Sequence, residues 1–316
     1  MEKLINQITK EQEQTLFYYS PYNFISDIKP GIQLDLIKEK ILNFINDNKQ
    51  THFTFRSTKN EVEFIFLYQY LDWDTDFFGR KCYKLYTILY NHFDIAALTE
   101  AINSFRNHLV NKEKVYIFSD IPSEDTRLIQ CLGLAGFKLV ESRLHYYKDA
   151  SKPYAAERYL VRIANKGDLR NIIEAATNSR NEYDRIHADI DFSNELADKY
   201  LGTYAESAFN GFCDAVIVPA EDGVNVNSFL AIKHLKDDAA HLSITSIRVA
   251  LTAVGASNKG WHKKLLSETI YYAKDHGAKY VLMTTQATNR AVIKNAENLG
   301  FNLGSTSHIF SFSHNL

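Results

Sequence analysis

The residues best placed to do chemistry lie in a loop between a predicted strand and a predicted helix. The strand covers residues 242–253, and the loop that follows it contains Gly255 and Gly260 before a helix begins at Trp261. The first turn of a helix has free backbone N–H groups and the positive end of the helix dipole, and both attract anions. Because glycine lets the backbone approach a ligand closely, the loop predicts a binding site for a diphosphate.

Lysines add positive charge around this loop, at positions 259, 263 and 264. A glycine-containing turn before a helix is nevertheless common, and the same residues are also compatible with an ordinary helix start. The interpretation therefore depends on the elements that surround the loop.

The second half of the chain predicts strands and helices in alternation. Strands are expected at 158–163, 215–218, 229–234, 242–253, 280–284 and 303–312, and helices at 167–177, 194–209, 263–275 and 290–298. The helix at 263–275 is the clearest, because Leu266, Ile270 and Ala273 form one apolar stripe. This order predicts an α/β fold with a mixed central sheet and helices on both faces.

The first half has a similar composition of elements. Helices are expected at 33–46, 94–110 and 124–134, and strands at 62–70, 82–90, 115–118 and 138–147. A chain of 316 residues is longer than one typical domain, which favours two. We expect an N-terminal domain at 1–150 and a C-terminal domain at 151–316.

The two halves align with each other without a gap. Residues 115–147 match the residues 164 positions later, so that Asp125 meets Asn289 and the Gly-Phe pair at 136–137 meets that at 300–301. Any strand–helix–strand segment could align in this way by chance. We interpret the match as an internal duplication.

The loop and its surroundings resemble the GNAT superfamily of acetyl-CoA-dependent N-acetyltransferases. Members of that superfamily bind the diphosphate of acetyl-CoA in a loop of the pattern Q/R-x-x-G-x-G/A that precedes a helix. Residues 257–262 read Ser-Asn-Lys-Gly-Trp-His. Gly260 matches the pattern fully, whereas Ser257 replaces the Arg or Gln and His262 replaces the second small residue.

The resemblance implies a GNAT fold in the C-terminal half, preceded by a truncated GNAT-like N-terminal domain. It also implies that acetyl-CoA is the co-substrate and that backbone amides at about 250–254 stabilise the oxyanion, with no side-chain nucleophile. The cofactor-binding residues that it implies are Leu251, Thr252, Ala253, Val254, Ser257, Asn258, Lys259, Gly260, Trp261, His262 and Asn289.

One departure from the family concerns the proton donor. The family pattern has a tyrosine seven residues after the asparagine, and counting from Asn289 reaches Ala296. Asn289 is the candidate catalytic residue, although it could equally be a helix N-cap. General acid catalysis contributes roughly 10²–10⁴-fold to a rate, so another donor or a water would have to act. Residues that could replace the tyrosine are Tyr204, His241, His262, Tyr280 and His308.

Within the superfamily, the chain is similar to the dTDP-fucosamine acetyltransferases. Residues 73–79, Trp-Asp-Thr-Asp-Phe-Phe-Gly, look like a segment at the end of an N-terminal strand in that group, or like an aromatic-packed turn. Arg185, Tyr204 and Ser207 look like its substrate-binding residues. The predicted function is transfer of an acetyl group to the amine of a small acceptor, favoured to be a nucleotide-linked amino sugar. Two alternatives are another amine acceptor, such as an antibiotic or peptide, and a degenerate GNAT-fold protein that binds CoA or a partner without catalysis.

Composition narrows the classes of partner. A net charge of −2 argues against a nucleic-acid-binding surface, and no apolar run is long enough for a membrane span. The first seven residues lack the apolar stretch of a signal peptide. The three cysteines form no CxxC pair, so we expect buried thiols and no metal site. We expect a cytoplasmic protein, with a homodimer left open.

Overall fold

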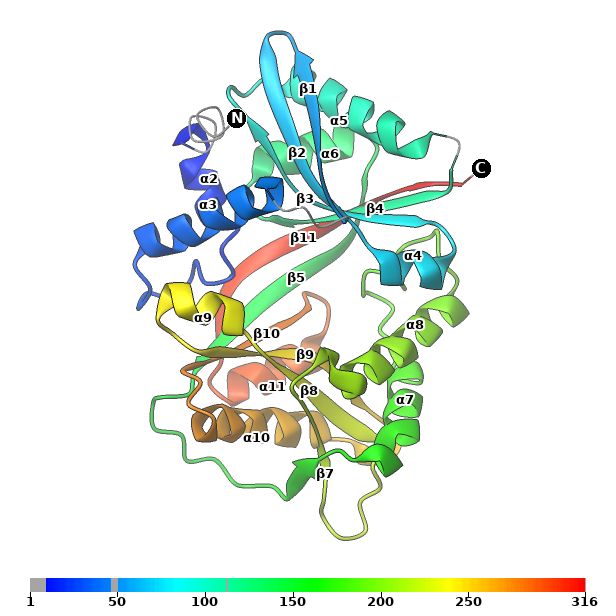
Figure 1. Cartoon of the computed structure of the whole chain (residues 1–316). Helices are drawn as coiled ribbons and strands as arrows, with labels where there is room; N and C mark the ends of the chain where they lie inside the picture. The colour runs from blue at the N-terminus through cyan, green and yellow to red at the C-terminus, as the bar shows by residue number, and fades with distance from the viewer. Residues whose placement is uncertain (1–9, 47–50, 112, 316) are drawn as a thin grey trace. The chain divides into compact units, whose positions relative to one another are not determined.

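The computed structural model describes residues 10–46, 51–111 and 113–315 (Figure 1). The first seven residues, which carried the expectation about a signal peptide, lie outside this range. The chain divides into two compact units: Met1–Ser142 with Ser305–Leu316, and Arg143–Gly304. The expected boundary after residue 150 therefore differs from the observed one, and the end of the chain belongs to the first unit.

The first unit contains a mixed sheet in the order β1–β2–β3–β4–β11. These strands are β1 (His52–Lys59), β2 (Val62–Tyr70), β3 (Lys81–Tyr90), β4 (Val115–Pro122) and β11 (Asn302–His314). β3 and β4 are parallel, whereas β1–β2, β2–β3 and β4–β11 are antiparallel. The strand β11, which follows the last helix of the second unit, thus completes the sheet of the first.

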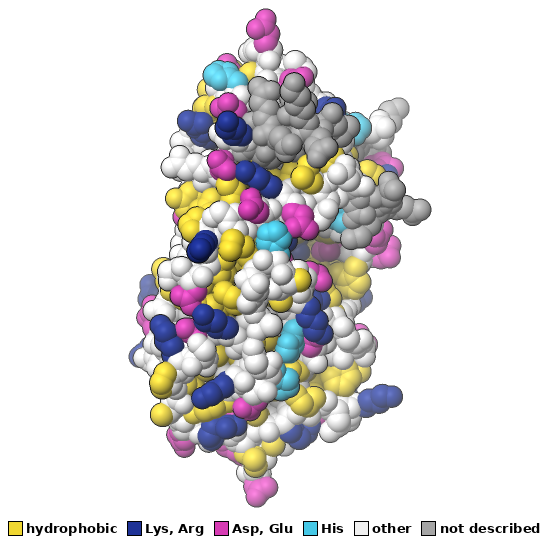
Figure 2. All heavy atoms as spheres, turned by 60° about the vertical axis from the view of Figure 1, so that its left-hand side comes forward, with side chains coloured by type: hydrophobic (Ala, Val, Ile, Leu, Met, Phe, Trp, Pro, Cys, Tyr) yellow, Lys and Arg dark blue, Asp and Glu magenta, His cyan; other side chains and the backbone are white. Residues whose placement is uncertain are grey.

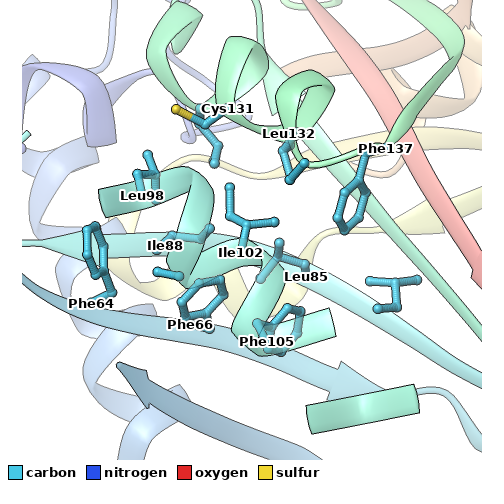
Figure 3. Packing of buried hydrophobic residues seen from close by; sticks show 14 of the residues in the cluster. Phe64, Phe66, Leu85, Ile88, Leu98, Ile102, Phe105, Cys131, Leu132 and Phe137 are labelled. Carbon is cyan, nitrogen blue, oxygen red and sulfur yellow. The ribbon is translucent and has the colours of Figure 1, made fainter. Parts of the chain in front are cut away.

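Helices cover both faces of this sheet. α2 (Glu13–Phe17) and α3 (Pro30–Asn46) lie on one face, and α5 (Ile95–Val110) and α6 (Thr126–Leu134) lie on the other. α4 (Asp72–Phe78) follows β2 and has no buried residue. Phe64 and Phe66 of β2 pack with Phe105 of α5, as Figure 3 shows, while Ile65 and Leu67 pack beneath α2 and α3. Because β2 is buried on both faces, its sequence is a nearly continuous apolar run.

The second unit repeats this design with the sheet order β5–β10–β9–β8–β7–β6. The strands are β5 (Lys138–Asp149), β6 (Val161–Ile163), β7 (Ala215–Pro219), β8 (Ser228–His234), β9 (Ser246–Val254) and β10 (Tyr280–Gln286). The helices are α7 (Leu169–Thr177), α8 (Asn194–Ser207), α9 (Lys236–Leu242), α10 (Trp261–Asp275) and α11 (Arg290–Asn298). α10 and α11 pack on one face of the sheet, and α7 and α8 on the other.

The structure supports the predicted duplication and extends it. A shift of 164 residues carries the bounds of α4 onto those of α9 and the bounds of α6 onto those of α11. It also carries Gly79, at φ 62°, onto Ser243, at φ 53°, and Gly136, at φ 80°, onto Gly300, at φ 75°. Matching left-handed positions at matching helix ends are unlike a chance alignment of a strand and a helix. The two units are therefore two copies of one α/β arrangement.

Several elements differ from the sequence prediction. α2 and β1 were not expected, and residues 73–78 lie in α4, with Gly79 as its left-handed C-cap, and not at the end of a strand. Within α4, Trp73 stacks on Phe77 one turn later, with ring centroids 5.9 Å apart. The strand expected from residue 242 begins only at Ser246, because 236–242 form α9. Short helices of this kind have too few residues for an apolar period to be visible.

None of the helices within 10–46, 51–111 and 113–315 has the length and apolar character needed to cross a membrane. The three cysteines are buried and free. On the face that Figure 2 shows, acidic and basic side chains are interspersed.

Candidate active site

The site begins where two neighbouring strands of the second unit part. β9 and β10 pair in parallel from Ser246–Tyr280 to Val249–Met283, and the pairing ends there although both strands continue. At the same point β9 carries a bulge: Leu251 lies opposite Ala231 and Val249 opposite Ile232, so Ala250 has no partner on β8. A bulge bends and twists a strand locally, which accounts for the divergence.

The divergence leaves one edge of β9 open. The N–H of Gly255 donates to the carbonyl of Asn227, at 2.8 Å, and so points toward β8. Backbone groups of successive residues point to opposite edges of a strand, so the N–H of Val254 and the carbonyl of Thr252 point toward the gap. These groups can pair with an extended ligand that carries amides.

The loop after β9 leads into the N-terminus of α10. Gly260 is the N-cap of α10 with φ 92°, and a Cβ built on it would meet no atom within 4 Å. Lys259 and Lys263 are exposed beside it. Lys264 is not available in the same way, because its Nζ lies 3.0 Å from both carboxylate oxygens of Glu221. The arrangement presents open space, free N–H groups and two lysines to an anion.

Several of the predicted cofactor-binding side chains have structural contacts instead. Asn258 is 6% exposed and donates to the carbonyl of Asn225, at 2.9 Å. The Ser257 hydroxyl accepts from the amide of Asn227. Ala253 and Trp261 are buried in the two cores of the unit. Any contact with a cofactor along this segment would therefore come mainly from the backbone.

His262 is buried between α10 and α11. Its Nδ1 accepts a hydrogen bond from the Asn295 amide, at 3.1 Å, and burial lowers its pKa to about 4. The ring is therefore neutral at pH 7 with the proton on Nε2, for which no partner exists among the described residues. His262 is a predicted cofactor-binding residue, but its Nε2 is buried and its neutral ring carries no charge that could attract a phosphate.

Asn289 and Ala296 lie at opposite ends of α11. Asn289 is the N-cap, and its Oδ1 accepts from the N–H of Val292 at 3.3 Å, as the helix-cap interpretation predicts. Ala296 is fully buried in the core that α11 shares with α10. A water that replaces the tyrosine could therefore not lie beside Ala296, because core atoms surround its methyl group.

The segment after α7 connects the two diverging strands. The Ser179 hydroxyl lies 3.5 Å from the carbonyl of Val254, at the end of β9. The Asn181 amide donates to Oε1 of Gln286, at the end of β10, with a distance of 2.7 Å. The start of this segment, at Ser179 and Asn181, thus borders the gap on the sheet face that α7 and α8 cover.

The predicted substrate-binding residues lie on this same face. Arg185 donates to the Tyr200 hydroxyl at 3.1 Å, and Tyr204 follows Tyr200 by one turn of α8. Burial raises the pKa of Tyr204 to about 12, and the nearby guanidiniums of Arg248, Arg143 and Arg185 only partly offset this. Ser207 is the last residue of α8.

Sequence reasoning missed two of these arginines. Arg248 lies between Ile247 and Val249, which both point into the core under α10, so strand alternation alone places Arg248 on the opposite face. Arg143 precedes Leu144 and Tyr146, which point into that same core. The sequence shows this alternation of side chains, but it does not show which strands become neighbours in the sheet.

No protein-family model matches the sequence, and no curated protein matches it. Solved structures show similar folds. A GCN5-related N-acetyltransferase from Sphaerobacter thermophilus is 13% identical over 88% of this chain and 85% of its own, with a TM-score of 0.55. A GCN5-related glucosamine N-acetyltransferase region of a fungal multi-domain β-N-acetylglucosaminidase is 11% identical over 96% of this chain and 37% of its own, with a TM-score of 0.56. A GCN5-related N-acetyltransferase from Kribbella flavida, 13% identical over 86% of this chain and 92% of its own, has a TM-score of 0.50. The α/β fold is therefore the GNAT fold.

The first prediction concerns His262 and pH. Between pH 6.5 and 4 the unfolded chain binds a proton at this imidazole and the folded chain does not, so the free energy of unfolding falls as the pH falls through this window. The expected loss is on the order of 3 kcal/mol. Denaturant unfolding of wild type and His262→Gln at pH 7.5 and 4.5 measures it, with exposed His276→Gln as the control. An equal pH dependence in wild type and His262→Gln would contradict the prediction.

The second prediction concerns Ala296. Because its methyl group is fully buried, Ala296→Tyr overfills the core and lowers the free energy of unfolding by about 1–3 kcal/mol or more. Ala291→Tyr, at an exposed position on the same helix, should change it little. Thermal unfolding of both variants makes the comparison. An Ala296→Tyr protein as stable as wild type would mean that the helix face is open after all.

Proposed function

We propose that this protein is an acetyl-CoA-dependent N-acetyltransferase that acts on the amine of a small acceptor. The observation that carries the proposal is the divergence of β9 and β10 directly before a helix whose N-cap is a left-handed glycine. The GNAT fold of the second unit supports it.

The residues around the gap suit acetyl-CoA. The N-terminus of α10, Gly260, and the exposed Lys259 and Lys263 would hold the diphosphate. The amide-bearing arm of CoA would lie along the open edge of β9, where Thr252 and Val254 present a carbonyl and an N–H. The thioester would then lie near the bulge at Ala250.

Acetyl transfer demands little of the side chains. The neutral amine attacks the thioester carbonyl, a C–N bond forms and the C–S bond breaks, while the amine loses a proton and the thiolate gains one. Backbone N–H groups near Ala250 would stabilise the oxyanion. Tyr204, whose pKa of about 12 keeps it protonated at neutral pH, is the proton donor that we favour.

For the acceptor we propose a nucleotide-linked amino sugar, bound by Arg185, Tyr204 and Ser207. The support is the sequence resemblance at these residues and their position along the face that borders the gap. Incubation with acetyl-CoA and dTDP-amino sugars, followed by measurement of released thiol, tests the function. Thiol release above the rate without amine is expected; no release with any of a broad panel of amines would contradict catalysis.

A second candidate is a GNAT-fold protein that binds CoA without catalysis. The observation in its favour is Ala296, because the family's tyrosine is missing and the core fills its place. Thermal stabilisation by acetyl-CoA, about 2.7 kcal/mol at 100 times the dissociation constant, is expected in both cases. A measurement of acetyl transfer distinguishes the two candidates, because only the enzyme turns over acetyl-CoA with an amine.

The first unit has the same strand divergence, but its gap is filled by its own chain. β3 and β4 pair from Lys81–Val115 to Leu85–Ser119 and then part. The side-chain amide of Gln12 donates to the Ile88 carbonyl, at 3.3 Å, and its oxygen accepts from the Tyr90 N–H, at 2.8 Å. A shift of 164 residues carries Ile88 and Tyr90 onto Thr252 and Val254, so Gln12 occupies the edge that is open in the second unit.

The helix that follows is also unsuited to a diphosphate. Asp94 caps α5, and its carboxylate accepts from the N–H of Ala97 at 2.7 Å. A negative charge at the helix N-terminus satisfies the free N–H groups and repels an anion. We therefore propose that only the second unit binds acetyl-CoA.

The third prediction tests the loop. Gly260→Val places a β-branched side chain at a positive φ and in the space before α10, and should weaken acetyl-CoA binding by roughly tenfold or more. Gly277→Val imposes similar strain, at φ 68° after the other end of α10, and should leave the affinity unchanged. Calorimetry on both variants measures this. Equal affinities in folded proteins would remove the loop from the site.

The fourth prediction is a stoichiometry of one acetyl-CoA per chain, measured by native mass spectrometry or calorimetry. Gln12→Ala frees the edge of β3, yet Asp94 still disfavours the diphosphate, so the stoichiometry should stay at one. Two bound molecules in the wild type would contradict the assignment of the first unit as a closed copy.

A further inference from the structure

We propose that the acceptor carries an anionic group, a carboxylate or a phosphate, and that the arginine cluster of Arg143, Arg185 and Arg248 binds it. The inference rests on the proposed function and adds the chemistry by which the acceptor is recognised. It stands on the placement of the three arginines around one face of the second unit.

Two of the arginines come from the sheet itself. Arg143 of β5 lies opposite Gln286 of β10, and Arg248 of β9 lies opposite Leu282 of the same strand. Leu144 and Val249, which follow these arginines in the chain, pack in the core beneath α10 and α11. Arg143 and Arg248 therefore lie on the opposite face, on either side of the gap.

The third arginine comes from the segment that borders the gap. Arg185 donates a hydrogen bond to the Tyr200 hydroxyl. Four residues earlier, Asn181 is hydrogen-bonded to Gln286, which lies opposite Arg143 on the neighbouring strand. Tyr204 lies on the same side of α8 as Tyr200 and packs its ring against Phe212, at 5.7 Å between centroids. These contacts place the segment after α7, the helix α8 and the strands β5 and β9 close to one another.

Two cationic side chains lie side by side at this place. Lys233 lies directly opposite Arg248 on β8 and β9, and like charges in such a pair are destabilising. Lys233 turns toward the Phe212 carbonyl, at 2.8 Å, and no carboxylate among the described residues forms an ion pair with Arg248. A bound anion would offset this repulsion.

Arginine is suited to this purpose. Its planar guanidinium forms two parallel hydrogen bonds to a carboxylate or phosphate, and such charge-assisted bonds are about twice as strong as neutral ones. Arg248 lies two residues before the bulge at Ala250, where the divergence begins. An anion bound here would be held beside the reacting carbonyl, which would fix the orientation of the amine on the same molecule.

The test compares matched amines with acetyl-CoA. The phosphate arm uses glucosamine 6-phosphate against glucosamine, and the carboxylate arm uses β-alanine against β-alaninamide. We expect the anionic member of at least one pair to have the higher kcat/KM. Arg248→Gln and Arg143→Gln should raise the KM of the anionic amine about 10- to 100-fold and leave the KM for acetyl-CoA unchanged. The kcat/KM values of the anionic and the neutral amine should then become similar. Arg170→Gln, at an exposed position on α7, is the matched control and should change nothing.

A binding measurement separates this proposal from the proposed function. In the Gly260→Val background, we measure how much more glucosamine 6-phosphate or β-alanine raises the melting temperature than its neutral partner does. If this extra stabilisation is lost in Arg248→Gln and partly kept in Arg248→Lys, it supports the arginine cluster even if no acetyl group is transferred. Acetyl transfer with equal kcat/KM for both members of each pair, unaffected by Arg248→Gln, overturns the cluster and leaves the acetyltransferase standing. Equal thermal stabilisation by charged and neutral amines, with no transfer, also overturns it.

Discussion

The parting of β9 and β10 after Val249 and Met283 is the constraint on which the rest of the site depends. A parallel pair of strands ordinarily satisfies its backbone groups across the whole length, and here the bulge at Ala250 ends that pairing early. The unpaired edge can be stable only if another partner satisfies it. The other features of the site lie around this edge: the loop and α10 at its end, and Ser179 and Asn181 beside it.

The first unit shows what happens when the partner is internal. There the same divergence follows the same kind of bulge, at Tyr86, and the amide of Gln12 makes the two hydrogen bonds that the edge requires. Asp94 caps the following helix where the second unit has the glycine loop. One architecture, copied within a chain, thus gives a closed gap in one unit and an open gap in the other, and the difference rests on a few polar side chains.

In our proposal, the two faces of the second sheet bind different substrates. α10 and α11 supply the deep core and the helix N-terminus for a diphosphate, and the buried, neutral His262 belongs to this side. The face toward α8 keeps polar and cationic side chains near the gap. A co-substrate on one side and an anionic acceptor on the other would meet only where the strands part, which is what direct transfer between them requires.

The sequence by itself determined the α/β class and most of the longer regular elements, and it indicated the duplication. β2 and α11 were predicted with the bounds observed, because apolar periodicity is a local property that survives folding. The sequence also indicated Gly260, because glycine is the residue that most readily adopts the left-handed backbone conformation of this N-cap. The tertiary structure alone decided that β11 joins the first unit, that His262 and Ala296 are buried, and that Arg143 and Arg248 lie on one face around Tyr204. These facts depend on which strands become neighbours, and that choice is made by packing between segments far apart in the chain, which no local pattern encodes.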